Sequence, residues 1–100
     1  MTFKVKFTPA AKLDIDDVIE WYDGQKRGLG RKFYIHLKSK VNYIQNYPYH
    51  CQLVHRDIRN VLVDKFPFQI SFIIEEFKKV VVIVAVTHTR RNPKNWKKRS

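Results

Sequence analysis

The spacing of apolar residues changes at Pro48, and this change constrains the fold more than any other feature of the 100-residue sequence. Before Pro48, apolar side chains recur every three or four residues in two stretches, which is the period of helices that bury one face. After Pro48, they form short runs rich in β-branched residues, which is typical of strands. We therefore expect one α+β domain covering residues 1–100, with a helical half followed by a sheet.

The two helical stretches have recognisable boundaries. Thr8 followed by Pro9 is typical of a helix N-cap with proline in the first turn. The first helix should continue to the glycine-containing segment 24–30, and the second should end no later than Pro48. We expect the two helices to form an αα-hairpin. The apolar positions that define them are Ala11, Ile15, Val18, Ile19 and Tyr22, then Phe33, Leu37, Val41 and Ile44.

Strands are expected on both sides of this hairpin. Residues 2–7 alternate apolar and polar side chains, which is the period of a half-buried strand. The run Val80–Val86 is apolar at every position, as expected for a central strand covered on both faces. We predict an antiparallel meander with this last strand inside, the order β-α-α-β-β-β, and a curled sheet with the hairpin on one face. The runs after Pro48 are Gln52–Val54, Asn60–Asp64, Phe68–Ile74 and Val80–Thr87.

Charge is distributed unevenly along the chain. The sequence holds 20 Lys and Arg against 9 Asp and Glu, for a net charge of +11. Residues 1–23 contain three lysines and five carboxylates, whereas the rest contains seventeen basic and four acidic residues. We therefore expect one acidic face and one strongly basic face, and a polyanionic partner. RNA, DNA, anionic lipid and an acidic protein all satisfy this expectation.

Several classes of protein and site are disfavoured. The single Cys51 excludes an internal disulfide framework and suits a reducing cytosol. No segment resembles a signal peptide and no apolar run is long enough to cross a bilayer, so we expect a cytoplasmic protein without a membrane partner. The segment 24–30 lacks the flanking features of a phosphate-binding loop. No cofactor and no metal are expected, because a helix start and a solvated face account for the acidic residues Asp14, Asp16, Asp17 and Glu20.

The C-terminal segment is the most basic part of the chain. No carboxylate follows Glu76, and basic residues fill much of the segment from about 90 to 100. One interpretation is that charge and aromatic stacking grip nucleotides there. The other is a solvated basic tail. The residues concerned are Arg90, Arg91, Lys94, Lys97, Lys98 and Arg99, with Pro93 and Trp96 between them.

His88 ends the predicted buried strand, where a rigid sheet gives way to a loop. A histidine there could move a proton near neutral pH. The adjacent Arg90 could stabilise the charge that develops when a 2′-hydroxyl attacks a phosphodiester, which gives metal-independent RNA cleavage. The alternative is a histidine that makes a structural hydrogen bond at the strand end.

Arg56 and Arg59 flank the start of the second half of the sheet. They either pair with Asp57 or Asp64, or Arg59 shares a sheet surface with His88 and adds a phosphate contact. The order and register of the strands decide between these possibilities, and the sequence does not fix the register.

An ordered series of segments resembles the RelE/ParE superfamily of type II toxin–antitoxin toxins over nearly the whole chain. The resemblance implies a compact, growth-inhibiting toxin. It also implies a cognate antitoxin that neutralises the toxin with an acidic, partly disordered segment. The segments are Phe7-Thr8-Pro9-Ala10-Ala11, Ile19-Glu20-Trp21-Tyr22, Gly28-Leu29-Gly30 with Phe33, Asn46-Tyr47-Pro48, Arg59, Phe66-Pro67-Phe68-Gln69-Ile70 and residues 84–93.

The superfamily divides by target. RelE-like members cut mRNA on the ribosome, and the resemblance aligns Arg59 with their strand basic residues and Arg90 with their late arginine. Trp96 falls where an aromatic residue, commonly tyrosine, is found. Gln69 departs from the pattern, because RelE-like nucleases carry an arginine there and a neutral amide cannot supply the same charge.

ParE-like members keep the fold, lack the nuclease residues and inhibit DNA gyrase, and the helical hairpin here looks more like theirs. We therefore favour DNA gyrase as the target, with a RelE-like mRNA endoribonuclease using His88, Arg90 and Arg59 as the alternative. A non-toxic nucleic-acid-binding module is a third possibility. The residues expected to bind the target or a nucleic acid are Arg56, Arg91, Lys94, Trp96, Lys97 and Lys98.

Overall fold

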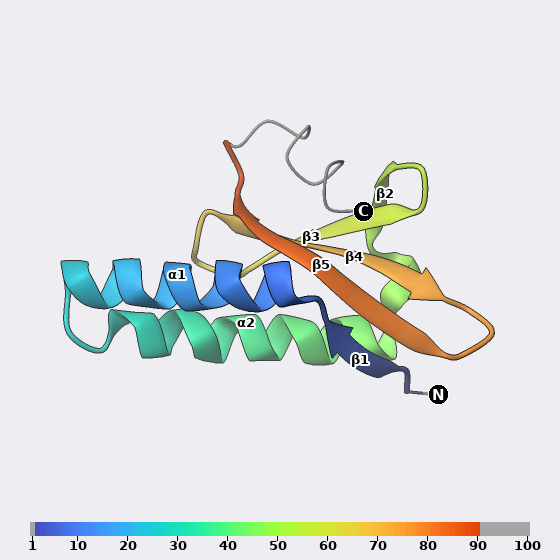
Figure 1. Ribbon diagram of the computed structural model, residues 1–100, viewed down its shortest axis with the longest axis horizontal. Coiled ribbons are helices and arrows are strands. Elements are labelled where there is room, and N and C mark those ends of the chain that lie inside the picture. Colours follow the sequence, from blue (N-terminus) through green and yellow to red (C-terminus); the bar gives the residue numbers. More distant parts are fainter. Residues whose placement is uncertain (1, 91–100) are drawn as a thin grey trace.

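The computed structural model describes residues 2–90. Two helices lie side by side against one face of a five-stranded sheet (Figure 1). The predicted α+β fold with a helical hairpin on a curled sheet is confirmed. The elements are β1 (Lys4–Phe7), α1 (Pro9–Gln25), α2 (Leu29–Asn46), the 3-10 turn η1 (Pro48–His50), β2 (Gln52–His55), β3 (Ile58–Leu62), β4 (Phe68–Glu75) and β5 (Val80–His88).

The sheet has the order β1-β5-β4-β3-β2, so the last strand lies inside it, as predicted. Two details differ from the expectation. Four strands follow the hairpin instead of the three in the predicted order, because the run at Gln52–Val54 forms a strand of its own, Gln52–His55, which pairs with β3. In addition, β1 is parallel to β5, which makes the sheet antiparallel except at this edge.

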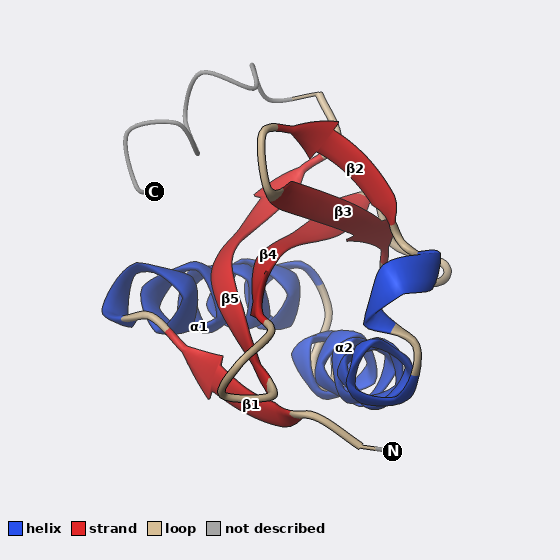
Figure 2. Cartoon of the chain, turned by 90° about the vertical axis from the view of Figure 1, so that its right-hand side faces the viewer, coloured by secondary structure: helices blue, strands red, loops and turns tan. Residues whose placement is uncertain are grey.

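A bulge helps to give the sheet its curl. The register between β4 and β5 shifts between Ser71 and Phe72. Bulges increase local twist and bend the strand that carries them. Figure 2 shows the resulting curl, which carries β2 and β3 away from α1.

The two helices begin in different ways. At α1, Thr8 Oγ1 accepts a hydrogen bond from the Ala11 N–H at 3.1 Å, and Pro9 occupies the first turn, so the predicted N-cap is confirmed. At α2, the N-cap is Gly28, which has a φ of 87° and no capping side chain. Asp23 Oδ1 instead accepts from the Gly30 N–H at 2.8 Å. The Asp23 carboxylate of α1 therefore caps the first turn of α2.

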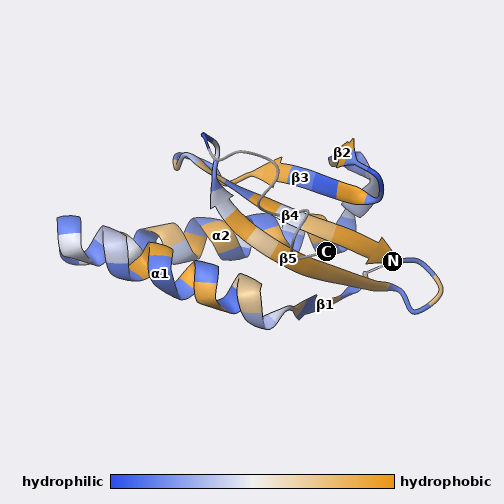
Figure 3. Ribbon diagram, turned by 45° about the horizontal axis from the view of Figure 1, so that its top comes forward, coloured by the Kyte–Doolittle hydropathy of each residue, from blue (hydrophilic) through white to orange (hydrophobic). Residues whose placement is uncertain are grey.

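The core lies mainly between the hairpin and the sheet. Alternate residues of β5 point to opposite faces, so the strand contributes to this core and to a smaller cluster on the outer face, as expected for a covered central strand. Figure 3 shows β4 and β5 as largely hydrophobic. The main cluster includes Ile15, Val18, Tyr22, Phe33, Leu37, Ile44, Ile70, Phe72, Val81, Ile83 and Val86, and the outer one Ile58, Val84 and Ala85.

The hairpin is divided by charge. α1 contains five carboxylates and one lysine, whereas α2 contains four lysines and arginines and no carboxylate. The acidic residues of α1 are not explained by the helix start, because none lies in the first turn, where the helix dipole favours a carboxylate. Asp16, Asp17 and Glu20 are exposed to solvent. Asp14 instead accepts a hydrogen bond from the backbone N–H of Val86 at 3.0 Å, which ties the helix to β5.

Candidate functional site

His88 lies at the end of β5 on the side of the sheet that faces the helices. It is opposite Phe68 of β4, and the two ring centroids are 5.3 Å apart. Its Nδ1 accepts a hydrogen bond from the Arg90 backbone N–H at 3.1 Å. When the ring is neutral, this contact leaves its proton on Nε2. The Thr89 N–H donates to the Pro67 carbonyl at 2.9 Å, which holds the turn after β5 against β4.

His88 forms one wall of a groove of about 340 Å³ between α1 and the ends of β4 and β5. The groove is mostly apolar and aromatic, and Asp17 is its carboxylate. Trp21 is 58% exposed beside it. Such a groove suits an apolar or cationic group better than a phosphate, because a carboxylate repels anions. The lining residues are Asp17, Val18, Trp21, Tyr22, Pro67, Phe68 and His88.

Arg59 lies on β3, and its guanidinium holds the segment that leads into β2. One of its nitrogens, Nη1, donates to the carbonyl oxygens of Cys51 at 2.8 Å and Tyr49 at 3.4 Å. The guanidinium also lies over the Tyr49 ring, 5.4 Å from its centroid. Burial raises the pKa of the Cys51 thiol, and Arg59 partly offsets this shift. Arg59 therefore has a structural role that its sequence neighbours did not indicate.

The structure does not bring Arg59 together with His88 and Arg90. Arg59 is opposite Phe72 on β4, whereas His88 is opposite Phe68. Four residues of strand separate these positions, which is about 13 Å along β4.

The remaining predicted site residues are distributed as follows. Arg56 is exposed in the turn between β2 and β3, with a positive φ of 49°. Arg90 is exposed directly after β5. Gln69 is opposite Thr87 on β5. Asp64, one of the two carboxylates considered as arginine partners, instead pairs with Lys40 at 3.3 Å. Arg91, Lys94, Trp96, Lys97 and Lys98 lie outside the described residues.

One polar surface was not anticipated from the sequence. Lys32, His36 and Lys40 are four residues apart, so they share a face of α2, and exposed aromatic rings continue this face toward η1. We call this surface the α2 ridge: Lys32, His36, Lys40 and Tyr43 of α2, Tyr47 directly after the helix, and His50 and Lys65 beside it. The signal in the sequence is the i, i+4, i+8 spacing of Lys32, His36 and Lys40, which lies beside the apolar positions that define the helix.

Within residues 2–90, no group of three or more His, Cys, Asp or Glu side chains is arranged to hold a metal ion. None of the helices in that range combines the length and apolar character needed to cross a membrane.

The sequence matches a known family along most of its length. Residues 5–93 match the family described as the ParE toxin of the type II toxin–antitoxin system parDE. The chain belongs to the ParE toxin family. No curated protein sequence matches it.

The fold of this ParE-family chain is similar to those of solved toxin–antitoxin proteins. A chain of the chromosomal ParDE system from P. aeruginosa superposes with a TM-score of 0.76 at 16% identity, covering 87% of this chain and 96% of that one. A chain of the intact E. coli RelBE complex gives 0.66 at 17% identity, with 89% and 99% covered. The RelBE2 complex from Mycobacterium tuberculosis gives 0.65 at 15% identity, with 88% and 99% covered. Both branches of the RelE/ParE superfamily therefore share this fold.

Proposed function

We propose that this chain is the growth-inhibiting toxin of a type II toxin–antitoxin module and that it acts on DNA gyrase, as the ParE-like branch of its superfamily does. The observation that carries the choice of target is the separation of Arg59 from His88 and Arg90 along the sheet. The match to the ParE toxin family supports the same branch.

Cleavage of a phosphodiester needs an acid or base and a cation within reach of the same phosphate. Here the arginine of β3 is engaged with the Cys51 carbonyl. The histidine faces a groove that contains Asp17, which repels an approaching phosphate. Gln69 is neutral, so it does not supply the positive charge that RelE-like nucleases have from an arginine at this position. This arrangement favours a toxin that acts by binding.

The alternative is a metal-independent mRNA endoribonuclease. It is favoured by one observation, the contact between the Arg90 backbone N–H and His88 Nδ1, which leaves Nε2 as the nitrogen that exchanges a proton. In that case His88 is the acid or base and Arg90 the cation. A non-toxic nucleic-acid-binding module is the third candidate, supported by the net charge of +11.

The proposed partner is a cognate antitoxin with an acidic, partly disordered segment. The basic chain supplies the complementary charge, and the matched P. aeruginosa structure is a ParDE system. Co-expression with the neighbouring small reading frame should restore growth and give a complex that high salt or denaturant dissociates. A neighbour that neither binds nor restores growth contradicts this part of the proposal.

The target is tested by inducing the full chain in bacteria and pulse-labelling DNA synthesis and translation within minutes. We expect DNA synthesis to stop first, and the purified chain to inhibit supercoiling by gyrase. His88→Ala should leave the arrest unchanged. Prompt arrest of translation that His88→Ala or Arg90→Ala abolishes supports the endoribonuclease and overturns the gyrase proposal. Salt-sensitive nucleic-acid binding without growth arrest supports the third candidate.

A further inference from the structure

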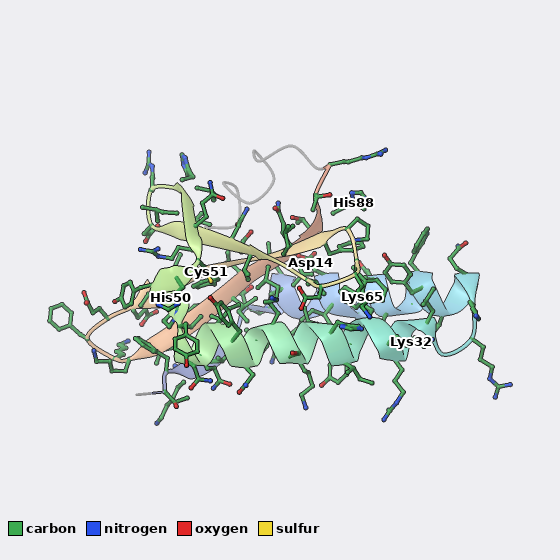
Figure 4. All side chains as sticks on the ribbon, turned by 180° about the vertical axis from the view of Figure 1, so that it is seen from behind. Asp14, Lys32, His50, Cys51, Lys65 and His88 are labelled. Carbon is green, nitrogen blue, oxygen red and sulfur yellow. The ribbon has the colours of Figure 1, made fainter. Side chains whose placement is uncertain are left out.

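The α2 ridge is a continuous surface of basic and aromatic side chains. His36 lies against Phe66 with ring centroids 5.6 Å apart, and Lys40 lies 5.4 Å from the centroid of Tyr43. The Tyr43 and Tyr47 centroids are 5.5 Å apart, and Tyr47 stacks on His50 at 5.1 Å with an angle of 14° between the rings. Figure 4 views this side, with Lys32 and Lys65 toward one end of α2 and His50 toward the other.

The rings of the ridge are not part of the core. Tyr47 is 51% exposed and Tyr43 is 37% exposed, and His50 is also exposed. Packing therefore does not account for three neighbouring rings on this surface. Exposed aromatic groups beside lysines are the arrangement that binds single-stranded nucleic acids, since every base offers a flat face for stacking.

The charge of the ridge points to the same class of ligand. α2 has no carboxylate, so no acidic side chain of the helix neutralises its lysines. The carboxylate of Asp64 lies beside the ridge and pairs with Lys40 at 3.3 Å. Lys32 and Lys65 are exposed. The ridge thus retains cations for phosphates next to rings for bases.

We propose that the α2 ridge binds a single-stranded nucleic acid, with bases on Tyr43, Tyr47 and His50 and phosphates near Lys32 and Lys65. From residue 32 to residue 47 the chain extends about 22 Å at the rise of a helix, which accommodates a short segment of one strand. A duplex presents phosphates but hides its base faces, so it leaves the rings unused. The ridge is separate from the groove at His88, and the proposal holds whether the toxin acts on gyrase or on mRNA.

Fluorescence anisotropy with the full chain tests this proposal. The probes are a fluorescein-labelled dT12 strand and the same strand annealed to dA12. Tyr43→Leu/Tyr47→Leu removes two rings without changing the charge. We expect this variant to bind dT12 about tenfold more weakly, as loss of base stacking predicts, and to bind the duplex as before. Tyr34→Leu is the matched control, because Tyr34 is also exposed on α2 and lies outside the ridge.

The lysines are tested by a charge-matched pair of variants. Lys32→Gln/Lys65→Gln should weaken dT12 binding and reduce the slope of log Kd against log salt by about 1.4, which is about 0.7 for each lost phosphate contact. Arg31→Gln/Lys38→Gln removes the same charge from exposed residues of α2 outside the ridge. It should change the affinity less than twofold. Every variant keeps the C-terminal segment, so the contribution of that segment to binding is common to all.

Three outcomes overturn the proposal. If Lys32→Gln/Lys65→Gln and Arg31→Gln/Lys38→Gln lose the same affinity for dT12, the strand is attracted by net charge alone. Unchanged dT12 binding in the tyrosine variant, with a native melting temperature, excludes stacking on these rings. Binding of a labelled oligoglutamate peptide that depends on the ridge, without binding of dT12, identifies the ridge as a surface for an acidic protein.

Discussion

The two helices of the hairpin carry opposite charge and use it differently. Two carboxylates of α1 accept hydrogen bonds from backbone N–H groups outside the helix, Asp14 from Val86 at 3.0 Å and Asp23 from Gly30 at 2.8 Å. On α2, Arg31, Lys32 and Lys38 are exposed. The charge of α1 thus helps to hold the fold, whereas much of the charge of α2 faces solvent. Net charge alone does not distinguish these two uses.

The helices also differ in how they begin. α1 has its own cap in Thr8, whereas α2 begins at a glycine and takes its hydrogen-bond acceptor from α1. Close contact between the helices makes this possible. α2 therefore depends on α1 at its first turn, and α1 does not depend on α2 in the same way.

The largest effect should come from closing the contact at Gly30. A Cβ added there lies 2.5 Å from the carbonyl oxygen of Ile19 and 2.8 Å from Asp23 Oδ1. We expect Gly30→Ala to reduce the free energy of unfolding by about 2–3 kcal/mol, because overpacking forces the two helices apart. Gly24→Ala is the control. Nothing lies within 4 Å of a Cβ at Gly24, so alanine should stabilise α1 there by about 0.5 kcal/mol.

Urea denaturation of the two glycine variants separates these expectations. If Gly30→Ala and Gly24→Ala change the free energy of unfolding equally, the helices are not in close contact at Gly30. The helix propensity of alanine then explains both changes.

The next effect should follow from removing the Asp14 carboxylate. Asp14→Ala leaves the Val86 N–H without this acceptor near the core. We expect the free energy of unfolding, measured by heat or urea, to fall by about 1–2 kcal/mol. Asp16→Ala is the matched control, because Asp16 is an exposed carboxylate two residues along the same helix. It should change stability by less than about 0.5 kcal/mol. A loss at Asp16 as large as that at Asp14 shows that charge, and not the hydrogen bond, is responsible.

Asp14 also illustrates what could be predicted from this sequence. The helices and the central strand follow from local spacing, and Thr8-Pro9 marks a helix start through neighbouring residues alone. The partner of Asp14 is 72 residues away in the chain, so no local pattern indicates it. The run Gln52–Val54 marks the position of β2, but the predicted order of three strands after the hairpin left this strand out. β2 has only four residues, three of them exposed, and it lacks the alternation that marks a half-buried strand.

The candidate site was also hard to predict, because its contacts depend on how the strands pair. The nearby carboxylates Asp57 and Asp64 were the visible partners for Arg59, yet its guanidinium contacts the carbonyl of Cys51. That contact depends on the pairing of β2 with β3, in which Arg59 is opposite Leu53. The register of the strands determines both the contact of Arg59 with Cys51 and the distance of Arg59 from His88. Because tertiary packing sets this register, the local sequence does not indicate either one.

A smaller effect is expected at the cap that α1 provides for α2. Asp23→Ala removes the acceptor of the Gly30 N–H and should cost about 1 kcal/mol of stability, the usual cost of a lost N-cap. Asp23→Asn keeps an oxygen at the same position and should lose less. Hydrogen exchange at the first turn of α2 provides a local measurement, since the Gly30 amide should exchange faster in the alanine variant. Unchanged exchange there contradicts the dependence of α2 on α1.

The smallest effect on stability should come from the cations of α2. Lys32→Gln and Lys38→Gln each remove an exposed charge, and we expect changes within about 0.5 kcal/mol in urea unfolding. Lys40→Gln sharpens the comparison, because Lys40 pairs with Asp64 and is the least exposed lysine of the helix. It should cost no more than about 1 kcal/mol, the upper range for a partly exposed ion pair. If Lys32→Gln destabilises the fold as much as Asp14→Ala does, the distinction between the two helices fails. If it leaves stability unchanged while weakening dT12 binding, the charge of α2 serves a ligand and not the fold.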